Sequence, residues 1–132
     1  MMKKILMMLM LFVSTNVFAV DWVKVSESVD DSYTFYVDPQ SIRRDGNKVR
    51  VWVLTDYKSV KVSGNKTYLS SVAREEYDCF EDTQRNIDIH AYQEKMGTGG
   101  IVVSVQNRTE PAISLPPGSM GAETLKIVCA TK

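Results

Sequence analysis

The chain has 132 residues, of which 44% are hydrophobic and 24% are charged, and its 16 basic and 16 acidic residues cancel at neutral pH. This length suits one folded domain, and the balanced charge argues against a general nucleic-acid binder or a protein that adheres to anionic membranes. The sequence has neither a block of like charges nor an internal repeat, so we expect a single domain.

The first 19 residues have the three parts of a secretory signal peptide. Residues 1–4 are short and positive, residues 5–13 form an unbroken apolar run, and residues 14–19 end in Val17-Phe18-Ala19. Small residues at the first and third positions before the cut suit signal peptidase, so we predict cleavage after Ala19. A transmembrane anchor is the alternative, but the apolar run is well short of the roughly 20 residues that a spanning helix needs.

Cleavage would leave a mature domain of residues 20–132, with 14 basic and 16 acidic residues. The junction carries no cysteine for a lipid anchor. We therefore expect an exported protein, periplasmic or secreted, without a lipid anchor or an integral membrane segment.

The first mature residues predict two strands and a break. Residues 22–27 and 33–37 alternate or are rich in aromatic and β-branched side chains, and the acidic stretch 28–32 between them fits a hairpin loop. Pro39 then fixes its own φ and biases Asp38 away from helix. We expect Ile42 to return to the core from this connection.

Residues 47–57 predict the central strand, delivered by the turn signal Asp45-Gly46-Asn47. Side chains alternate with a period of two, and apolar residues fall on both faces. Val49, Val51 and Val53 lie on one face, and Trp52 and Leu54 lie on the other. This pattern indicates a strand that is covered on both sides.

Three further strands follow, at residues 67–79, 84–93 and 101–106. Gly64-Asn65, residues 80–83 and residues 97–100 mark the turns that separate them. A helix over residues 72–77 is an alternative, because AREEY is a tolerable helix sequence. Six strands joined by short connections favour antiparallel pairing, since parallel strands need long crossovers.

The C-terminal part predicts a short helix. Residues 108–117 contain three prolines and should be irregular, and Ser119 is a good helix N-cap with Glu123 in the first turns. Leu125, Val128 and Cys129 then fall on one face at helical spacing. An isolated helix of this length is marginal in water, so it must dock on the sheet.

Cys79 and Cys129 are the two cysteines of the chain, and an exported protein meets an oxidising compartment. We predict that they form a disulfide rather than a metal site, because the chain has a single histidine and a metal site needs more ligands. The bridge would stabilise the folded protein by about 4 kcal/mol, because closing this loop lowers the entropy of the unfolded chain. The expected fold class is α+β, with a single antiparallel sheet of about six strands and a C-terminal helix tethered by the disulfide to one face.

No catalytic residue is indicated. His90 has Asp88 and Tyr92 on its own face of the strand, but nothing in the spacing selects Ser70, Ser71 or Ser104 as a nucleophile. A partly exposed strand histidine is the simpler interpretation. His90 is possible as a haem ligand, but nothing in the sequence selects it for that role. We expect no enzyme, no metal site and no cofactor from the residues themselves.

A partner-binding surface is the remaining candidate. Aromatic residues occur beside basic ones, and the proposed contact residues are Lys58, Lys61, Lys66 and Arg74, beside Trp52, Tyr57, Tyr36 and Tyr68. The alternative is core aromatics with a solvated rim. Two functions therefore stand: an exported binding module, or a periplasmic structural or accessory protein of the cell envelope with no host ligand.

Several phrases of the mature chain together resemble the surface-adhesin protein E family, small exported proteins of Gram-negative bacteria. The phrases are WV at 22–23, YVDPQSIRR at 36–44, VWVLTDY at 51–57, EYDC at 76–79 and PGSMG at 117–121, followed by Cys129. The resemblance implies the same six-stranded sheet with a disulfide-tethered helix, often as a homodimer. It also implies binding of a protein or extracellular-matrix partner such as vitronectin, laminin or plasminogen, with haem as a further ligand of the family.

Overall fold

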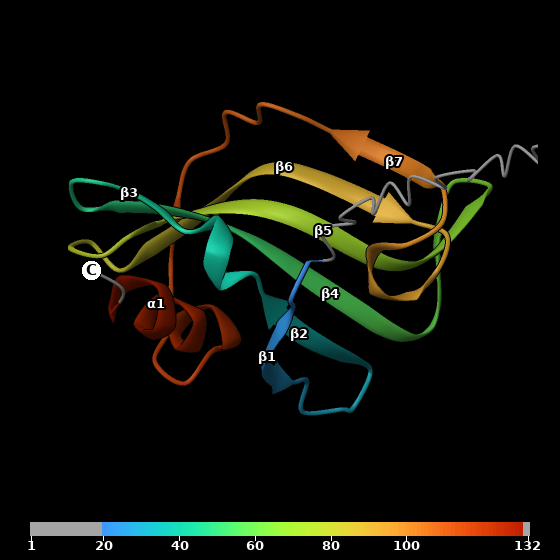
Figure 1. Ribbon diagram of the computed structural model, residues 1–132, viewed down its shortest axis with the longest axis horizontal. Coiled ribbons are helices and arrows are strands. Elements are labelled where there is room, and N and C mark those ends of the chain that lie inside the picture. Colours follow the sequence, from blue (N-terminus) through green and yellow to red (C-terminus); the bar gives the residue numbers. More distant parts are fainter. Residues whose placement is uncertain (1–19, 131–132) are drawn as a thin grey trace, which may run out of the picture.

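Long antiparallel hairpins build the centre of the protein, because short turns return residues 66–78 and 83–92 along the strands before them. The structure is a computed structural model that describes residues 20–130, so the predicted signal peptide lies outside the described residues. Figure 1 shows one twisted sheet with a single helix against it. The elements are β1 (Val23–Glu27), β2 (Tyr33–Val37), the 3₁₀ turn η1 (Pro39–Ser41), β3 (Arg43–Asp45), β4 (Lys48–Ser63), β5 (Lys66–Asp78), β6 (Thr83–Tyr92), the 3₁₀ turn η2 (Lys95–Gly97), β7 (Ile101–Val105), β8 (Ile113–Ser114) and α1 (Met120–Ala130).

The main path of the sheet is β1-β2-β4-β5-β6-β7, and each neighbouring pair is antiparallel. The predicted single antiparallel sheet is therefore confirmed. Five of its six strands match their predicted bounds to within one residue at each end. The stretch for which a helix was the alternative belongs to β5, where pairing with β4 and β6 on both sides holds it extended.

The central strand β4 is longer than expected. It continues past Tyr57 to Ser63, with a register irregularity between Asp56 and Lys61. The hairpin closes at Gly64, whose φ of +62° suits the left-handed region that glycine tolerates. The prediction placed the turn correctly, but it ended the strand early because the polar residues after Tyr57 break the apolar alternation.

Two short strands, β3 and β8, were not predicted. Every residue of both is exposed, so neither has an apolar pattern that a sequence could reveal. β3 pairs with the first residues of β4, and β8 pairs with Thr83 and Gln84 of β6. Backbone hydrogen bonds to a neighbouring strand define them.

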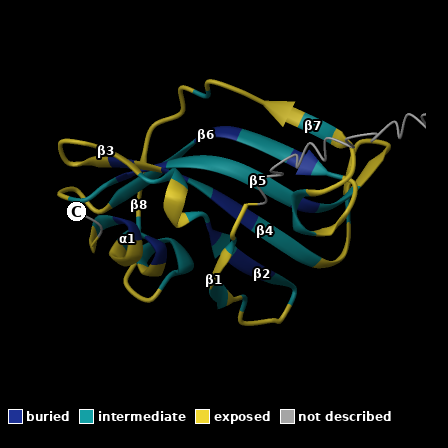
Figure 2. Cartoon of the chain, viewed as in Figure 1, coloured by how far each residue is buried: buried dark blue, intermediate teal, exposed yellow. Residues whose placement is uncertain are grey.

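The core lies between the sheet and α1. Its buried residues come from the central strands and the helix, and Ile42, Leu125 and Cys129 pack against them. Figure 2 shows this burial along the middle of β2 and β4. The buried members are Phe35, Val37, Val49, Val51, Val53, Tyr77 and Val128. The return of Ile42 to the core is thus confirmed.

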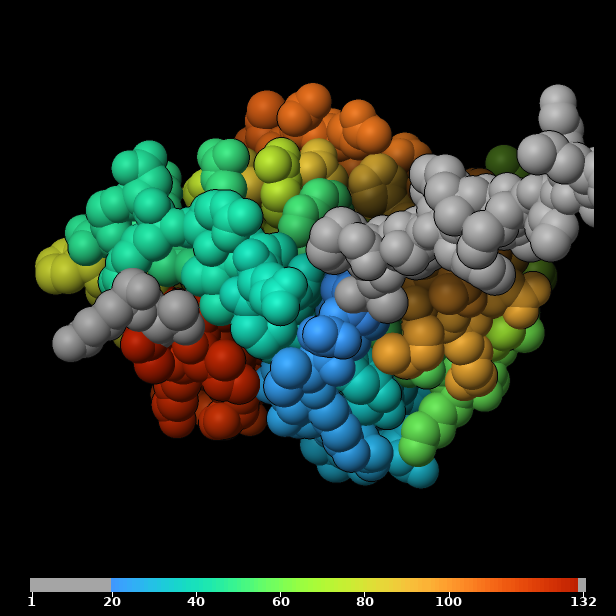
Figure 3. Space-filling view, in the orientation of Figure 1, coloured from blue at the N-terminus to red at the C-terminus, as the bar shows by residue number. Residues whose placement is uncertain are grey.

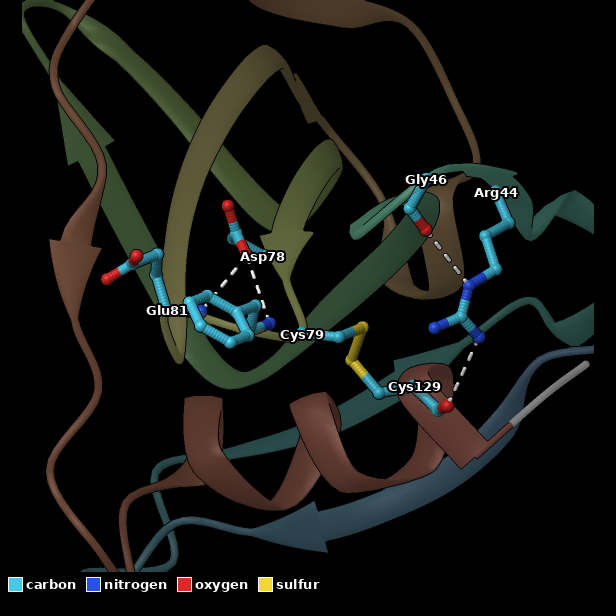
Figure 4. Close-up of a disulfide and its surroundings, with 7 residues drawn as sticks. Arg44, Gly46, Asp78, Cys79, Glu81 and Cys129 are labelled. Atoms are coloured by element: carbon cyan, nitrogen blue, oxygen red, sulfur yellow. Dashed lines mark hydrogen bonds between the residues drawn. A yellow bond between two sulfur atoms is a disulfide. The ribbon is translucent and has the colours of Figure 1, made fainter.

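A disulfide between Cys79 and Cys129 attaches α1 to the end of β5, with 5.8 Å between the two Cα atoms (Figure 4). The predicted bridge and the tethered helix are confirmed. Ser119 caps the helix, because its Oγ accepts a hydrogen bond from Ala122 N at 3.2 Å. At the other end, Arg44 donates to the carbonyl of Cys129 at 3.4 Å.

The second face of β4 is covered by η2, at Leu54. Leu54 is 0% exposed, and a Cβ at Gly97 would lie 3.1 Å from its Cδ1. Asp56 and Ser70 hold the turn in place: Met96 N donates to Asp56 Oδ1, and Gly97 N donates to Ser70 Oγ, each at 2.8 Å. The two-sided covering of the central strand therefore comes from two elements, α1 and η2.

The space-filling view shows β3 and the nearby β5–β6 turn at one end of the molecule, next to α1 (Figure 3).

Candidate functional site

A cluster of aromatic and charged side chains lies on the sheet face opposite α1, which we call the open face. Trp52 of β4 pairs in register with Arg74 of β5, and Arg74 pairs with Asp88 of β6, so all three side chains share this face. The Arg74 guanidinium lies 6.0 Å from the Trp52 ring centroid, and its Nε lies 2.8 Å from Asp88 Oδ2. The ring of His90 stacks on Trp52 at 6.1 Å.

The open face brings one of the three candidate serines to His90. Ser104 Oγ lies 2.8 Å from His90 Nδ1, whereas Ser70 holds η2 through Glu94 O and Gly97 N. Asp88 lies two residues from His90, but its carboxylate pairs with Arg74 and accepts a hydrogen bond from Asn107 N at 2.9 Å. Asp88 thus positions Arg74. Its carboxylate does not orient His90, as the third member of a Ser-His-carboxylate triad would.

The surroundings of His90 do not fit a haem. A histidine that ligates haem iron lies in an apolar cleft that encloses the porphyrin. The polarity of that cleft sets the chemistry of the haem. His90 instead lies on a pleated face, stacked on Trp52 and bonded to Ser104. Among the described residues, no group of three or more histidine, cysteine, aspartate or glutamate side chains could hold a metal ion.

The four basic residues proposed as partner contacts divide between two regions. Arg74 lies in the middle of the open face. Lys58 forms an ion pair with Asp31, and this hydrogen bond raises the pKa of Lys58. Lys61 lies over the ring of Tyr57 at 5.3 Å, and Lys66 Nζ donates to Val102 O at 3.4 Å.

Tyr57 links Lys61 to an aromatic cluster. Its ring centroid lies 6.2 Å from that of Tyr33 and 5.8 Å from that of Tyr68, and both pairs are edge-to-face. Tyr33 and Tyr57 also line a groove of about 490 Å³ that extends to the N-terminus of α1 at Met120. The structure therefore groups Lys61 with tyrosines, and Arg74 with Trp52.

A third group, around Glu76, was missed by sequence reasoning. Glu76 is only 6% exposed, and its carboxylate accepts hydrogen bonds from Arg50 Nε at 2.9 Å and Arg85 Nε at 3.0 Å. Lys48 Nζ lies 3.8 Å from it. Burial alone would raise the pKa of Glu76, but the hydrogen bonds from Arg85 and Arg50 lower it. Only the register of three strands reveals this group, because its members are scattered along the chain.

Comparisons with known proteins identify relatives of the whole domain. Residues 22–130 match the family described as Surface-adhesin protein E. The fold is similar to crystal form II of Haemophilus influenzae protein E, with a TM-score of 0.64 and 16% identity, over 85% of this chain and 92% of that one. It is also similar to protein E from non-typeable Haemophilus influenzae, with a TM-score of 0.64 and 16% identity, over 88% and 80% of the two chains. No curated protein sequence matches the chain.

In residues 20–130, no helix is long and apolar enough to cross a membrane.

Proposed function

The chain belongs to the surface-adhesin protein E family, and we propose from this premise that it is an exported, non-catalytic binding module for a protein or extracellular-matrix partner. Membership places it among surface-adhesin-type modules and favours a non-enzymatic role. The finer proposal concerns the partner and the surface that holds it.

The observation that carries the proposal is the arrangement of Trp52, Arg74 and His90 on the open face. Tryptophan, tyrosine and arginine are the residues most often found at the energetic centres of protein interfaces. Arg74 is held over Trp52 by Asp88, so little side-chain entropy remains to be lost when a partner binds. Lys58, Lys61 and Lys66 would add charge along the β4–β5 hairpin, where electrostatic attraction speeds encounter with an acidic partner.

The contacts of the four basic residues decide how they should be tested. Replacing Arg74 alone would leave the buried carboxylate of Asp88 without its ion pair, which costs stability. The lysines can be replaced together, whereas Arg74 should be changed together with Asp88.

We expect the triple variant Lys58→Ser, Lys61→Ser and Lys66→Ser to bind immobilised vitronectin or laminin about tenfold more weakly than the parent protein, by surface plasmon resonance. The pair Arg74→Gln with Asp88→Asn should have a similar effect. Binding of the parent protein should also weaken with salt, because exposed charges are screened over about 8 Å at physiological ionic strength.

The matched control is the pair Lys24→Ser and Lys126→Ser, which removes two exposed lysines from local ion pairs elsewhere and should leave binding unchanged. Melting temperatures should stay within a degree or two throughout. Partner capture that is indifferent to salt and to both sets of substitutions would rule out both the open face and the lysines of the β4–β5 hairpin as contacts. Protection of the protein from added protease on intact cells would favour the periplasmic accessory role instead.

A further inference from the structure

A hollow of about 420 Å³ lies beside the β3–β4 hairpin, at the end of the sheet where β3 projects (Figure 1). Its basic lining residues come from three strands, β3, β4 and β6. We call them the cationic pocket: Arg43, Arg44, Lys48, Arg50 and Arg85.

The cationic pocket has an excess of positive charge. Two acidic residues, Asp45 and Glu76, line it, and the guanidinium of Arg44 is directed to Cys129 O at the end of α1. The four other basic side chains therefore leave an excess of two positive charges. Glu76 is shared by Arg50, Arg85 and Lys48, so one carboxylate faces three cations. The mature chain as a whole has more acidic than basic residues, so this concentration of cations is local.

Three arginines of the pocket, Arg43, Arg50 and Arg85, are held in place while some of their N–H donors remain available. Arg43 donates to two neutral carbonyls, Gln40 O and Ile42 O, each at 2.9 Å. Arg50 and Arg85 donate to Glu76 through Nε, and Arg85 also donates to Arg108 O through Nη1 at 3.2 Å. A guanidinium has five N–H donors in a planar fork, so each keeps others for a ligand. Such forks match the oxygens of sulfate, phosphate or carboxylate groups with two hydrogen bonds.

The pocket continues onto the open face. A second hollow, of about 330 Å³, shares Arg43 and Arg50 with the first and extends to Trp52 and Arg74. The cationic surface is therefore an elongated recess rather than a single-ion site. A linear chain with repeated anionic groups can follow such a recess, whereas a flat membrane surface cannot enter it.

We propose that the cationic pocket binds the sulfate groups of a sulfated polysaccharide. The choice of an extracellular polyanion rests on the proposed function, which places the domain outside the cell. The site itself is separate from the lysines of the β4–β5 hairpin.

The test measures binding of a heparin oligosaccharide by isothermal titration calorimetry. The pair Arg43→Gln and Lys48→Gln removes two exposed cations and spares the short bonds of Arg50 and Arg85 to Glu76. We expect this variant to bind roughly tenfold more weakly or worse, since hydrogen bonds to charged groups are among the stronger ones. Its affinity should also depend less steeply on salt, because fewer counterions are released.

Asp45→Asn should have the opposite effect on the affinity for heparin. It removes an exposed negative charge from the pocket wall and should tighten heparin binding several-fold. Lys24→Gln with Lys126→Gln, two exposed lysines outside the pocket, serves as the matched control and should change nothing. Melting temperatures equal to that of the parent protein confirm that each variant is folded.

The proposal would be overturned by unchanged affinity in the Arg43→Gln, Lys48→Gln variant, or by equal affinity for heparin and its chemically desulfated, carboxylate-bearing form. Equal binding of a DNA oligonucleotide would likewise show a general polyanion site. Capture of vitronectin or laminin without any heparin binding would defeat this site and leave the proposed function standing. Heparin binding without capture of either protein would leave this site standing and rule out vitronectin and laminin as partners in the proposed function.

Discussion

Glu75 and Glu76 are neighbours in β5 and have opposite electrostatic environments. Glu76 points to the open face and is surrounded by cations. Glu75 lies opposite Val51 in the register, toward α1, where the hydroxyl of Tyr77 donates a hydrogen bond to it. Burial raises the pKa of Glu75 to about 7, although the bond from Tyr77 acts in the other direction. The pKa values of two adjacent carboxyl groups are thus shifted in opposite directions.

Glu75 makes stability fall as the pH rises. Its pKa in the unfolded chain is near 4.5 and in the folded chain about 7, so the folded state binds more protons between these values. Its contribution is complete below pH 4.5 and is lost as the pH passes 7. Between pH 5.5 and 8 the loss should be about 2 kcal/mol.

Glu75→Gln, which stays neutral, should abolish most of this slope and unfold at higher urea concentration than the parent protein at pH 8. Urea titrations at pH 5.5 and 8 measure it, and Glu123→Gln on the exposed face of α1 is the control. The window avoids the region in which Glu76, whose pKa is lowered, becomes protonated. A parent protein with equal stability at both pH values would contradict the assignment.

At the scale of elements, α1 depends on its attachments. It has 11 residues, too few to persist alone in water, and its buried contacts come from Thr124 and Val128. The Ser119 cap and the disulfide at Cys129 secure its two ends. The strands, by contrast, are held by continuous ladders along β4, β5 and β6.

Replacing both cysteines, Cys79→Ser with Cys129→Ser, should therefore release the helix before the sheet. Amides of residues 120–130 should exchange faster in hydrogen–deuterium exchange, while those of β4 and β5 keep most of their protection. The free energy of unfolding should fall by up to about 4 kcal/mol, the chain-entropy value for a loop of this length. Equal acceleration in the helix and the central strands would show that the two unfold as one unit.

At the scale of the whole molecule, the sheet presents two different faces. One is closed by α1 over an apolar core, and the other is partly closed by η2 and carries Trp52, Arg74 and His90. The cationic pocket lies at one end and the tyrosine cluster extends toward the helix side. The pocket is continuous with the open face through Arg43 and Arg50, whereas the groove beside the tyrosine cluster has a different lining.

We further propose that export removes residues 1–19 from the chain. The match to the family begins at residue 22, which agrees with a mature domain that starts close to it. N-terminal sequencing of the protein purified from the periplasm or medium should begin Val20-Asp21-Trp22. A purified protein that retains Met1 would contradict cleavage.

Local patterns in the sequence were enough to determine most of the elements. A period of two along residues 49–54 shows a strand covered on both faces, and Gly64 marks its hairpin. Ser119 marks the start of the helix. The two cysteines allow a single pairing, so the docking of the helix also followed. The strand, the turn and the helix start depend on residues that are neighbours in the chain. The disulfide follows because two cysteines can pair in only one way.

The tertiary structure decided which side chains meet. Arg50, Glu76 and Arg85 form one charge cluster because three strands align there, and a register shift beside Glu75 sets that alignment. The same holds for Arg74 with Asp88. Strand register is set by contacts distant in sequence, and one residue of slip would move every side chain to the other face. Periodicity shows that a residue has a face, but only the assembled sheet shows which residues share it.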